Sequence, residues 1–284
     1  MIRSLPASRI YNHLFNLYVF LYFIFLFAPL VITCVLAFND SQFPALPWKG
    51  FTLEWFFGNL QNRVGVFHDQ IILKSLWTSF RTAFFVTVLS LVVGTCGAFL
   101  FEQEDFRFKP LLYFLMLAPL VIPGVILGIS ILLLSNTVGS YFEQHWNFDV
   151  ALFRPSFWLV VLGQFSFIAT LVTLVVSARL KKFDLSLEEA AMNLGANRFE
   201  AILFITLRFL RPALIGAGAV AFLMSFENFN TTLFLVGSEA TLPINLYLQV
   251  RDGSTPVINA VSFLLILGTS SVALANLYFR RKNE

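Results

Sequence analysis

The chain carries, at residues 17–38, the stretch LYVFLYFIFLFAPLVITCVLAF, in which none of the 22 residues is charged. The hydrocarbon core of a bilayer is about 30 Å thick, so a helix that crosses it needs roughly 20 apolar residues. The stretch meets that length, and it exceeds the apolar core of about 7 to 15 residues that a secretory signal peptide contains. We therefore expect a retained membrane span.

Five further stretches have the same apolar character, which predicts an all-α integral membrane protein with six transmembrane helices. The chain is 58% hydrophobic and 12% charged, with a mean hydropathy of +0.78. Ordinary soluble domains are about 25% charged, so this composition requires a lipid environment. The further spans are expected at residues 76–101, 111–134, 157–178, 213–236 and 257–279.

The distribution of Lys and Arg predicts that both the N and the C terminus are cytoplasmic. In that orientation the inner segments hold 13 of these residues and the outer loops hold five, and basic residues accumulate on the cytoplasmic side. Arg81, near the start of the second span, belongs to neither group. The expected division is a cytoplasmic segment at 1–16, a first helix and outer loop at 17–75, a core domain with five transmembrane helices at 76–279, and a cytoplasmic tail at 280–284.

Several classes of function lack their signatures in this sequence. The net charge is only +3, so there is no electrostatic footprint for a nucleic acid. His13, His68 and His145 are far apart, and Cys34 and Cys96 lie within apolar runs, so no metal site is expected. A G-x-x-x-x-G-K-[ST] phosphate loop is also missing. We expect no cofactor on this chain, so any ATP and Mg²⁺ must be bound by a partner.

The connection between spans four and five, residues 179–211, has a regular pattern. Ser186 and Glu189 predict a capping box that begins a short helix, and Gly195 is expected to end that helix. A second amphipathic helix is expected at 198–210. Two short helices that meet at a glycine form a knob that the groove of another protein would hold. The alternative is an amphipathic pair that lies on the membrane surface.

Glu227 lies about 14 residues into the fifth span, where an ionisable group is costly unless it is paired, protonated or facing water. We expect it to attract a cationic solute, with Phe226 or Phe229 offering an aromatic face to an ammonium group. The alternative is a structural carboxylate paired with Arg81. The polar residues expected to line a path beside Glu227 are Ser225, Asn228, Asn230, Thr231 and Thr232.

Pro119 and Pro123, with Gly124 and Gly128, predict a kink in the third span. Such a kink suits a gate helix, and a packing kink without a gating role explains it equally well. Further polar lining is expected from the fourth span. The residues concerned are Gln164, Ser166 and Thr170.

The run EAAMNLG at 189–195, followed by ITL at 205–207, resembles the EAA signature of permease subunits in binding-protein-dependent ABC importers. In that family E-A-A is followed, after three intervening residues, by Gly and ten positions later by I-x-L-P. Arg208 replaces the Pro here, and Pro212 is expected to stop the second helix instead. The resemblance implies contact between a partner ATPase and the residues Glu188, Glu189, Ala190, Ala191, Gly195, Ile205 and Leu207.

Two other runs, APLVIPGVILGI at 118–129 and SFENF at 225–229, are similar to permeases of the spermidine/putrescine group. That group has two acids, S-F-D-D-F, where this chain has Glu227 and the neutral Asn228. The resemblance implies a type I importer with a MetI-like bundle in a bacterial inner membrane. It also implies a second, paralogous permease subunit, a cytoplasmic ATPase dimer and a periplasmic solute-binding protein.

The implied solute is a polyamine or another small organic cation. Permeases with similar third and fifth spans import ferric iron, phosphonates or thiosulfate-like anions, so these solutes remain open. An ion-coupled secondary transporter would explain six spans and Glu227 but not the loop at 179–211. An intramembrane enzyme lacks any paired catalytic signature such as G-x-S-x-G or H-E-x-x-H. We therefore expect a transport subunit without catalysis of its own.

Overall fold

The computed structural model describes residues 9–44, 46–60, 63–146, 151–253 and 255–282, and these residues are mostly helical. Five helices of the described part are long and apolar enough to cross a membrane, which confirms the predicted all-α membrane class. These five helices are Ile10–Leu36, Gln70–Gln103, Gly124–Trp146, Phe157–Leu180 and Arg198–Phe226.

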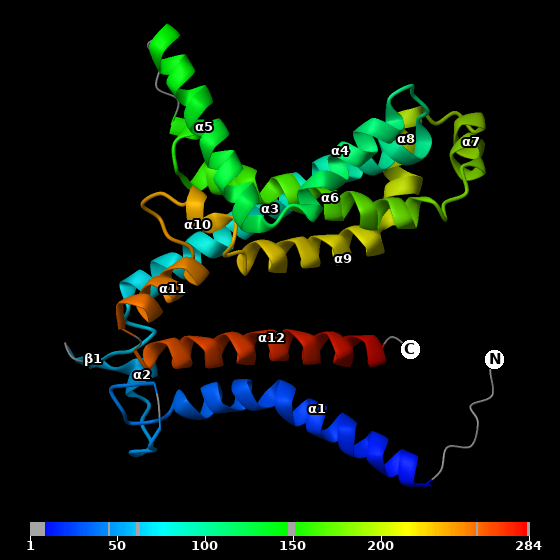
Figure 1. The fold of residues 1–284 in the computed structure, drawn as a ribbon. Helices are drawn as coiled ribbons and strands as arrows, with labels where there is room; N and C mark the ends of the chain where they lie inside the picture. Colours follow the sequence, from blue (N-terminus) through cyan, green and yellow to red (C-terminus); the bar gives the residue numbers. More distant parts are fainter. Residues whose placement is uncertain (1–8, 45, 61–62, 147–150, 254, 283–284) are drawn as a thin grey trace. The chain divides into compact units, whose positions relative to one another are not determined.

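The chain divides into two compact units. One unit consists of Met1–Leu73 and Leu246–Glu284, and the other consists of Lys74–Asn245. Figure 1 shows the helices of each unit in the colours of the sequence. The residues with candidate functions all lie in the second unit, Lys74–Asn245.

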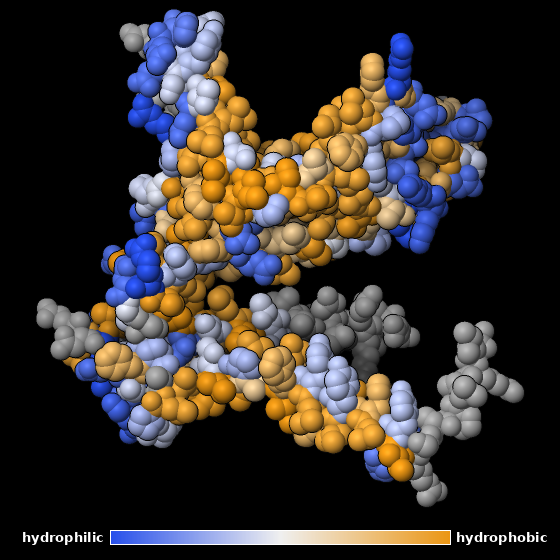
Figure 2. All heavy atoms as spheres, viewed as in Figure 1, coloured by the Kyte–Doolittle hydropathy of each residue, from blue (hydrophilic) through white to orange (hydrophobic). Residues whose placement is uncertain are grey.

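Helix α6 (Phe157–Leu180) is the centre of the unit Lys74–Asn245. Its apolar residues are distributed around the whole helix, so neighbours can enclose it. Helices α3 (Gln70–Gln103) and α9 (Leu207–Phe226) pack against it and bury an apolar core. Figure 2 shows apolar side chains over the middle of this unit and hydrophilic ones at the end that carries α7 and α8. The buried core residues of α6 are Val161, Ile168, Val172, Val176 and Leu180.

The third predicted span consists of two helices rather than one kinked helix. Helix α4 (Lys109–Val121) ends before Pro123, and α5 (Gly124–Trp146) begins after it. Pro123 disfavours helical geometry at the residue before it, and Ile122 is extended with a ψ of 128°. Pro119 lies inside α4. The predicted continuous helix at 111–134 was therefore wrong at one point, the peptide before Pro123.

The fifth predicted span begins earlier and ends earlier than expected. Helix α8 (Arg198–Ala201), a π-helical turn (Ile202–Thr206) and α9 form one continuous helix, Arg198–Phe226. Pro212 lies inside α9, so the prediction that it stops a separate second helix was wrong. The other elements of this unit are η1 (Ala151–Phe153), α7 (Ser186–Asn193), α10 (Thr232–Leu235) and the first residues of α11 (Leu242–Gly253).

The other unit contains the first and last helices of the chain. Helix α1 (Arg9–Leu36) contacts α12 (Val257–Lys282), and the rings of Phe38, Phe56 and Phe263 cluster with centroids 5.0 to 5.8 Å apart. None of the apolar window of α1 is buried inside the chain, as expected for a helix solvated by lipid. The remaining elements are the helix α2 (Glu54–Phe57) and the antiparallel strands β1 (Asn59–Leu60) and β2 (Arg63–Val64).

Side-chain hydrogen bonds organise the predicted outer loop of this unit. The Trp55 indole N–H donates to the carbonyl oxygen of Asn39 at 2.8 Å. Arg63 contacts Glu54 at 2.6 Å and Asp40 at 2.7 Å. Hydrogen bonds to Glu54 and then to Asp40 raise the pKa of Arg63 above its usual range. The loop is thus held together by its own polar groups.

Candidate functional site

Glu227 lies at a break in the fifth predicted span. Helix α9 ends at Phe226, and Glu227 is its C-terminal capping residue. The side chain is exposed and forms no hydrogen bond or ion pair with any residue that the structure describes. The C-terminal end of a helix carries a partial negative charge, so a carboxylate there is unfavourable unless a cation accompanies it.

A buried network of four polar side chains holds the segment after Glu227. Gln164 of α6 is fully buried and donates to the Thr232 hydroxyl at 2.8 Å. The Ser225 hydroxyl donates to the Gln164 carbonyl oxygen, and Thr232 donates to Asn228 at 3.0 Å. Buried polar groups need such partners because water does not reach them to form hydrogen bonds. The network joins α6, the end of α9 and the start of α10.

Helix α5 packs closely against the same segment. A methyl group at Gly128 would lie 2.8 Å from the carbonyl oxygen of Thr231. Non-bonded Cβ atoms in proteins essentially never come this close to another heavy atom. A methyl group at Gly124 would lie 3.1 Å from Cβ of Asn230. Small residues of this kind allow backbones to approach in membrane proteins. The break between α4 and α5 therefore lies beside the break between α9 and α10.

The structure separates the predicted pathway residues into two groups. Glu227 and Asn230 are exposed, and Phe226 and Asn228 are half-buried. Ser225 and Thr231 are 3% and 1% exposed, so both are enclosed by helices of this chain. Because the helix ends at Phe226, the residues Glu227, Asn230 and Thr231 do not lie on one helical face, as they would in the predicted span 213–236.

One alternative and one expectation about neighbouring side chains were wrong. Arg81 pairs with Glu239 at 2.6 Å and lies over the Phe157 ring, so it is not the partner of Glu227. Gln164 and Thr170 are buried, and the Thr170 hydroxyl donates to the carbonyl oxygen of Met116 in α4 at 2.8 Å. Both side chains join helices instead of lining a path.

The loop between α6 and α8 begins with a different cap from the one predicted. Ser186 is the first residue of α7 and makes no capping box with Glu189. Asp184 accepts a hydrogen bond from the Ser186 backbone N–H at 3.0 Å. Hydrogen bonds from the hydroxyl and the backbone of Ser186 hold the pKa of Asp184 below its usual range. The capping box of this loop is formed by Asn197 and Glu200, at the start of α8.

Gly195 gives the end of α7 its geometry. Its φ is +98°, in the left-handed region that favours glycine. The Gly195 N–H donates to the carbonyl oxygen of Met192, and the Ala196 N–H donates to that of Ala191. These two bonds form a Schellman motif, which confirms that glycine closes this helix.

The turn between α7 and α8 exposes apolar side chains. Leu194 is 91% exposed and Phe199 is 71% exposed, and Leu187 of α7 is half exposed. Glu189 is exposed without a described partner, whereas Glu188 is 8% exposed. We call this surface, formed by Leu187, Glu189, Met192, Leu194 and Phe199, the α7 knob.

The other residues of the EAA resemblance differ in their exposure. Ala190 is exposed, Ala191 is half-buried, and Ile205 and Leu207 pack against the apolar core. Glu188 accepts a hydrogen bond from the buried Thr206 hydroxyl.

The family model of the binding-protein-dependent transport system inner membrane component matches residues 94–284. The chain belongs to this family. The match includes the α7 knob, both helix breaks and α12. The protein is therefore a multi-pass inner-membrane permease component, as the sequence predicts.

Two relatives of this permease component are polyamine permeases by name. The putrescine transport system permease protein PotI of Escherichia coli is 30% identical over 268 residues, which cover 92% of this chain and 89% of the relative. The spermidine/putrescine transport system permease protein PotC of Haemophilus influenzae is 26% identical over 271 residues, covering 95% and 97%.

Solved structures of two transporters share the fold. A bacterial ABC transporter involved in the import of the acidic polysaccharide alginate has a TM-score of 0.68 at 14% identity, covering 98% of this chain and 99% of that one. An amino acid ABC transporter has a TM-score of 0.51 at 18% identity, covering 76% and 96%. These likenesses support the predicted permease bundle.

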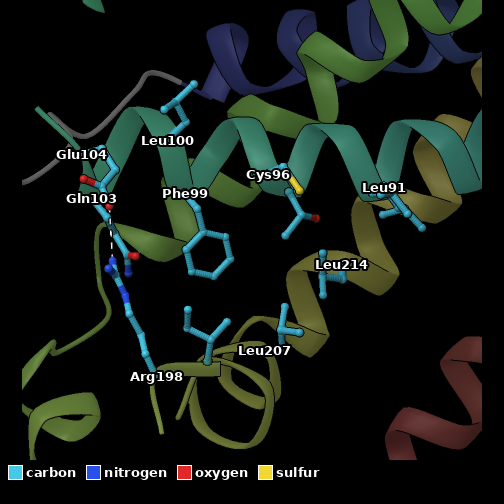
Figure 3. A pocket seen from close by; sticks show the side chains of 12 residues that line it. Leu91, Cys96, Phe99, Leu100, Gln103, Glu104, Arg198, Leu207 and Leu214 are labelled. Carbon is cyan, nitrogen blue, oxygen red and sulfur yellow. Dashed lines mark hydrogen bonds and ion pairs between the residues drawn. The ribbon is translucent and has the colours of Figure 1, made fainter. Parts of the chain in front are cut away.

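A pocket of about 730 Å³ lies in this permease between α3 and the helix Arg198–Phe226 (Figure 3). Its lining is largely apolar, with Leu91, Phe99 and Leu207 among the side chains that face it. At one end Arg198 contacts Glu104 at 3.2 Å. The pocket leaves the α3 side of the π-helical turn without close packing.

The sequence did not predict the contacts of Gln164, in the buried network after Glu227, or those of Thr206, behind the α7 knob. A Gln in the middle of an apolar span is costly without partners, which is a detectable signal. Thr206 lies between Ile205 and Leu207, the two residues that the EAA resemblance includes. The resemblance gave no role to Thr206 itself.

Proposed function

We propose that this permease component is half of the translocation pathway of an ATP-driven importer for polyamines or a related small organic cation. A second, paralogous permease subunit completes the pathway. A cytoplasmic ATPase dimer binds ATP and Mg²⁺, and a periplasmic binding protein delivers the solute. The family description supports the binding protein, and the names of the relatives support the solute class.

The unpaired carboxylate of Glu227 is the observation that supports a cationic solute. It is exposed at the carbonyl end of α9, where both its own charge and the helix dipole repel anions. Discontinuous helices form substrate and ion sites in many transporters, since their free ends contact charged groups. Asn230 is exposed on the same segment and offers an amide oxygen. An ammonium group beside Glu227 would relieve the unfavourable charge.

The α7 knob carries the link to the ATPase in this proposal. Its exposed leucines and phenylalanine are the type of anchor that a groove on another protein buries. With both termini in the cytoplasm, the knob lies on the same side as the ATPase. Closure of the ATPase dimer pulls the knob and rocks the bundle between inward-open and outward-open states. Pro123 gives the gate its break between α4 and α5.

The test of the solute compares Glu227→Gln with Glu227→Asp in the complete reconstituted importer. Removal of one charge-assisted contact raises the half-saturating concentration of labelled putrescine by about tenfold in Glu227→Gln. Glu227→Asp keeps the charge and stays within about threefold of the unmodified protein. Uptake is normalised to the amount of assembled complex.

Wild-type uptake of putrescine by Glu227→Gln would remove this residue from the solute site. Uptake of an anion such as phosphonate, with none of putrescine, would refute the cation class while leaving the importer assignment intact. Uptake that persists after the ATPase is inactivated would favour an ion-coupled transporter.

A further inference from the structure

Glu189, the first residue of the EAA run, and Glu188, the residue before it, have different surroundings. Glu189 is exposed on the α7 knob, whereas Glu188 is 8% exposed and faces the inside of the protein. The buried Glu188 carboxylate accepts a hydrogen bond from Thr206, whose side chain is fully buried. A buried hydrogen bond to a charged group is among the stronger contacts of a protein. It connects α7 directly to the helix that continues into α9.

Thr206 occupies an unusual position in that helix. Residues Ile202–Thr206 are π-helical, and the Leu207 N–H donates to the carbonyl oxygen of Ile202, five residues earlier. Single π-helical turns are rare and occur often at functional sites. On the α3 side, Ile202 and Leu207 line the pocket of about 730 Å³. The turn is therefore held from the α7 side more than from the α3 side.

The covalent connection between α7 and α8 is a short turn on the surface of the protein. It passes through Gly195 at a φ of +98°, with nothing within 4 Å of where a Cβ would lie. Leu194 beside it is 91% exposed. The ion pair of Arg198 with Glu104 is largely solvent-exposed and contributes little. A hinge at Gly195 would let α7 move alone unless a second contact ties it to the long helix.

We infer that the Glu188–Thr206 hydrogen bond is this second contact and carries the displacement of α7 to α9, which makes Thr206 a positioning residue for transport. The inference rests on the proposed coupling between the α7 knob and an ATPase. It assigns the two acids separate tasks: Glu189 meets the partner, and Glu188 connects the knob to the membrane helix.

The experiment follows movement at both ends of the link without using a solute. Cys34 and Cys96 are the two free cysteines of the chain, and Ser replaces both. A single reporter cysteine is then placed either on α7, by Asn193→Cys, or on the exposed side of α9, by Leu223→Cys. Maleimide labelling rates are measured in membrane vesicles that contain the whole complex, before and after ATP with vanadate.

In the reporter proteins ATP with vanadate changes the labelling rate at both positions. Thr206→Val removes the hydroxyl donor at nearly constant shape, so the change persists at Asn193→Cys and falls by about tenfold at Leu223→Cys. Thr206→Ser keeps the hydroxyl and restores both changes. A purely structural role would alter both reporters together or neither.

An unchanged response at Leu223→Cys in Thr206→Val overturns the inference. If Thr206→Val does not assemble, Glu188→Gln and Glu188→Ala replace it, because the Gln oxygen still accepts the bond and Ala has no acceptor. Equal responses of these two variants at Leu223→Cys also overturn it. Absence of any ATP response at both reporters in otherwise unmodified chains overturns the proposed coupling as well.

Discussion

The segment after α9 and the loop around α7 are both interruptions between helices, yet they satisfy their groups in opposite ways. After α9, Gln164, Ser225, Asn228 and Thr232 bond to one another, and the exposed Glu227 carboxylate has no partner among the residues that the structure describes. Around α7, the backbone is capped within the loop, while Leu194 is left exposed.

The difference follows from the surroundings that each interruption must tolerate. Within a membrane no solvent bonds to polar groups, so an interruption there needs partners from the same protein. Outside the membrane, water satisfies polar groups and an exposed leucine is the costly element. The segment after α9 therefore satisfies its buried polar groups within this chain, whereas the α7 knob leaves apolar side chains exposed, which we propose another protein covers.

The largest expected effect concerns the knob. Leu194→Asp places a charge where a partner surface is expected to bury an apolar side chain, and the complex with the ATPase should be lost. Leu194→Met keeps the apolar volume and should retain the complex. Co-purification of the ATPase with each variant measures this. Equal recovery with Asp and Met would show that Leu194 lies outside the interface.

The buried network gives the next largest effect. Gln164→Leu leaves the Ser225 hydroxyl without its acceptor and removes the donor to the Thr232 hydroxyl, which keeps its bond to Asn228. The free energy of unfolding should fall by about 3 kcal/mol. Ser166→Ala in the same helix should cost under about 0.5 kcal/mol, since Ser166 bonds only to the carbonyl oxygen of Gly163 in its own helix. Denaturation in detergent compares the two. A similar loss in both would mean that the network contributes no special stability.

A smaller loss is expected from close packing at α5. Gly128→Ala pushes a methyl group to 2.8 Å from the Thr231 carbonyl oxygen and should destabilise the protein by about 2 kcal/mol. Gly216→Ala in α9 meets nothing within 4 Å and should be neutral or stabilise by about 0.5 kcal/mol. Thermal unfolding of the two variants decides. A stabilised Gly128→Ala would show that the segment after α9 shifts to accommodate the methyl group at little cost.

The smallest effect is a pH dependence at the start of α7. The pKa of Asp184 is below its usual range in the folded protein, so its contribution is present above the unfolded pKa and is lost as pH falls through the folded pKa. Hydrogen exchange of the Ser186 amide should therefore lose protection at acid pH. Asp184→Asn should remove that pH dependence. Persistence of the dependence in Asp184→Asn would assign it to another group.

Some of these features could be predicted because they depend on neighbours in the sequence. Pro123 marks the break between α4 and α5, and Gly195 marks the end of α7, since each acts through its own backbone geometry. The end of α9 at Phe226 has no such marker. Its last turn bonds through Ser225 to Gln164, which lies in another helix and is 61 residues away in the sequence.

The choice of capping box shows the same limit. Ser186 with Glu189 and Asn197 with Glu200 both have the required spacing, and only the second pair forms. Glu188 and Glu189 are likewise equivalent by composition, and burial against Thr206 separates them. Local patterns permit several outcomes, and packing against distant residues selects among them.

The sequence by itself determined that this protein is a helical membrane protein, because span length and apolar character are local properties that a bilayer imposes. The permease assignment came from the resemblance of residues 189–207 to the EAA signature. The tertiary structure alone decided where the fifth span breaks, which of Glu188 and Glu189 is buried, and which polar side chains stay exposed. Those outcomes depend on contacts between helices, whose partners are set by the three-dimensional packing of apolar surfaces and buried hydrogen bonds.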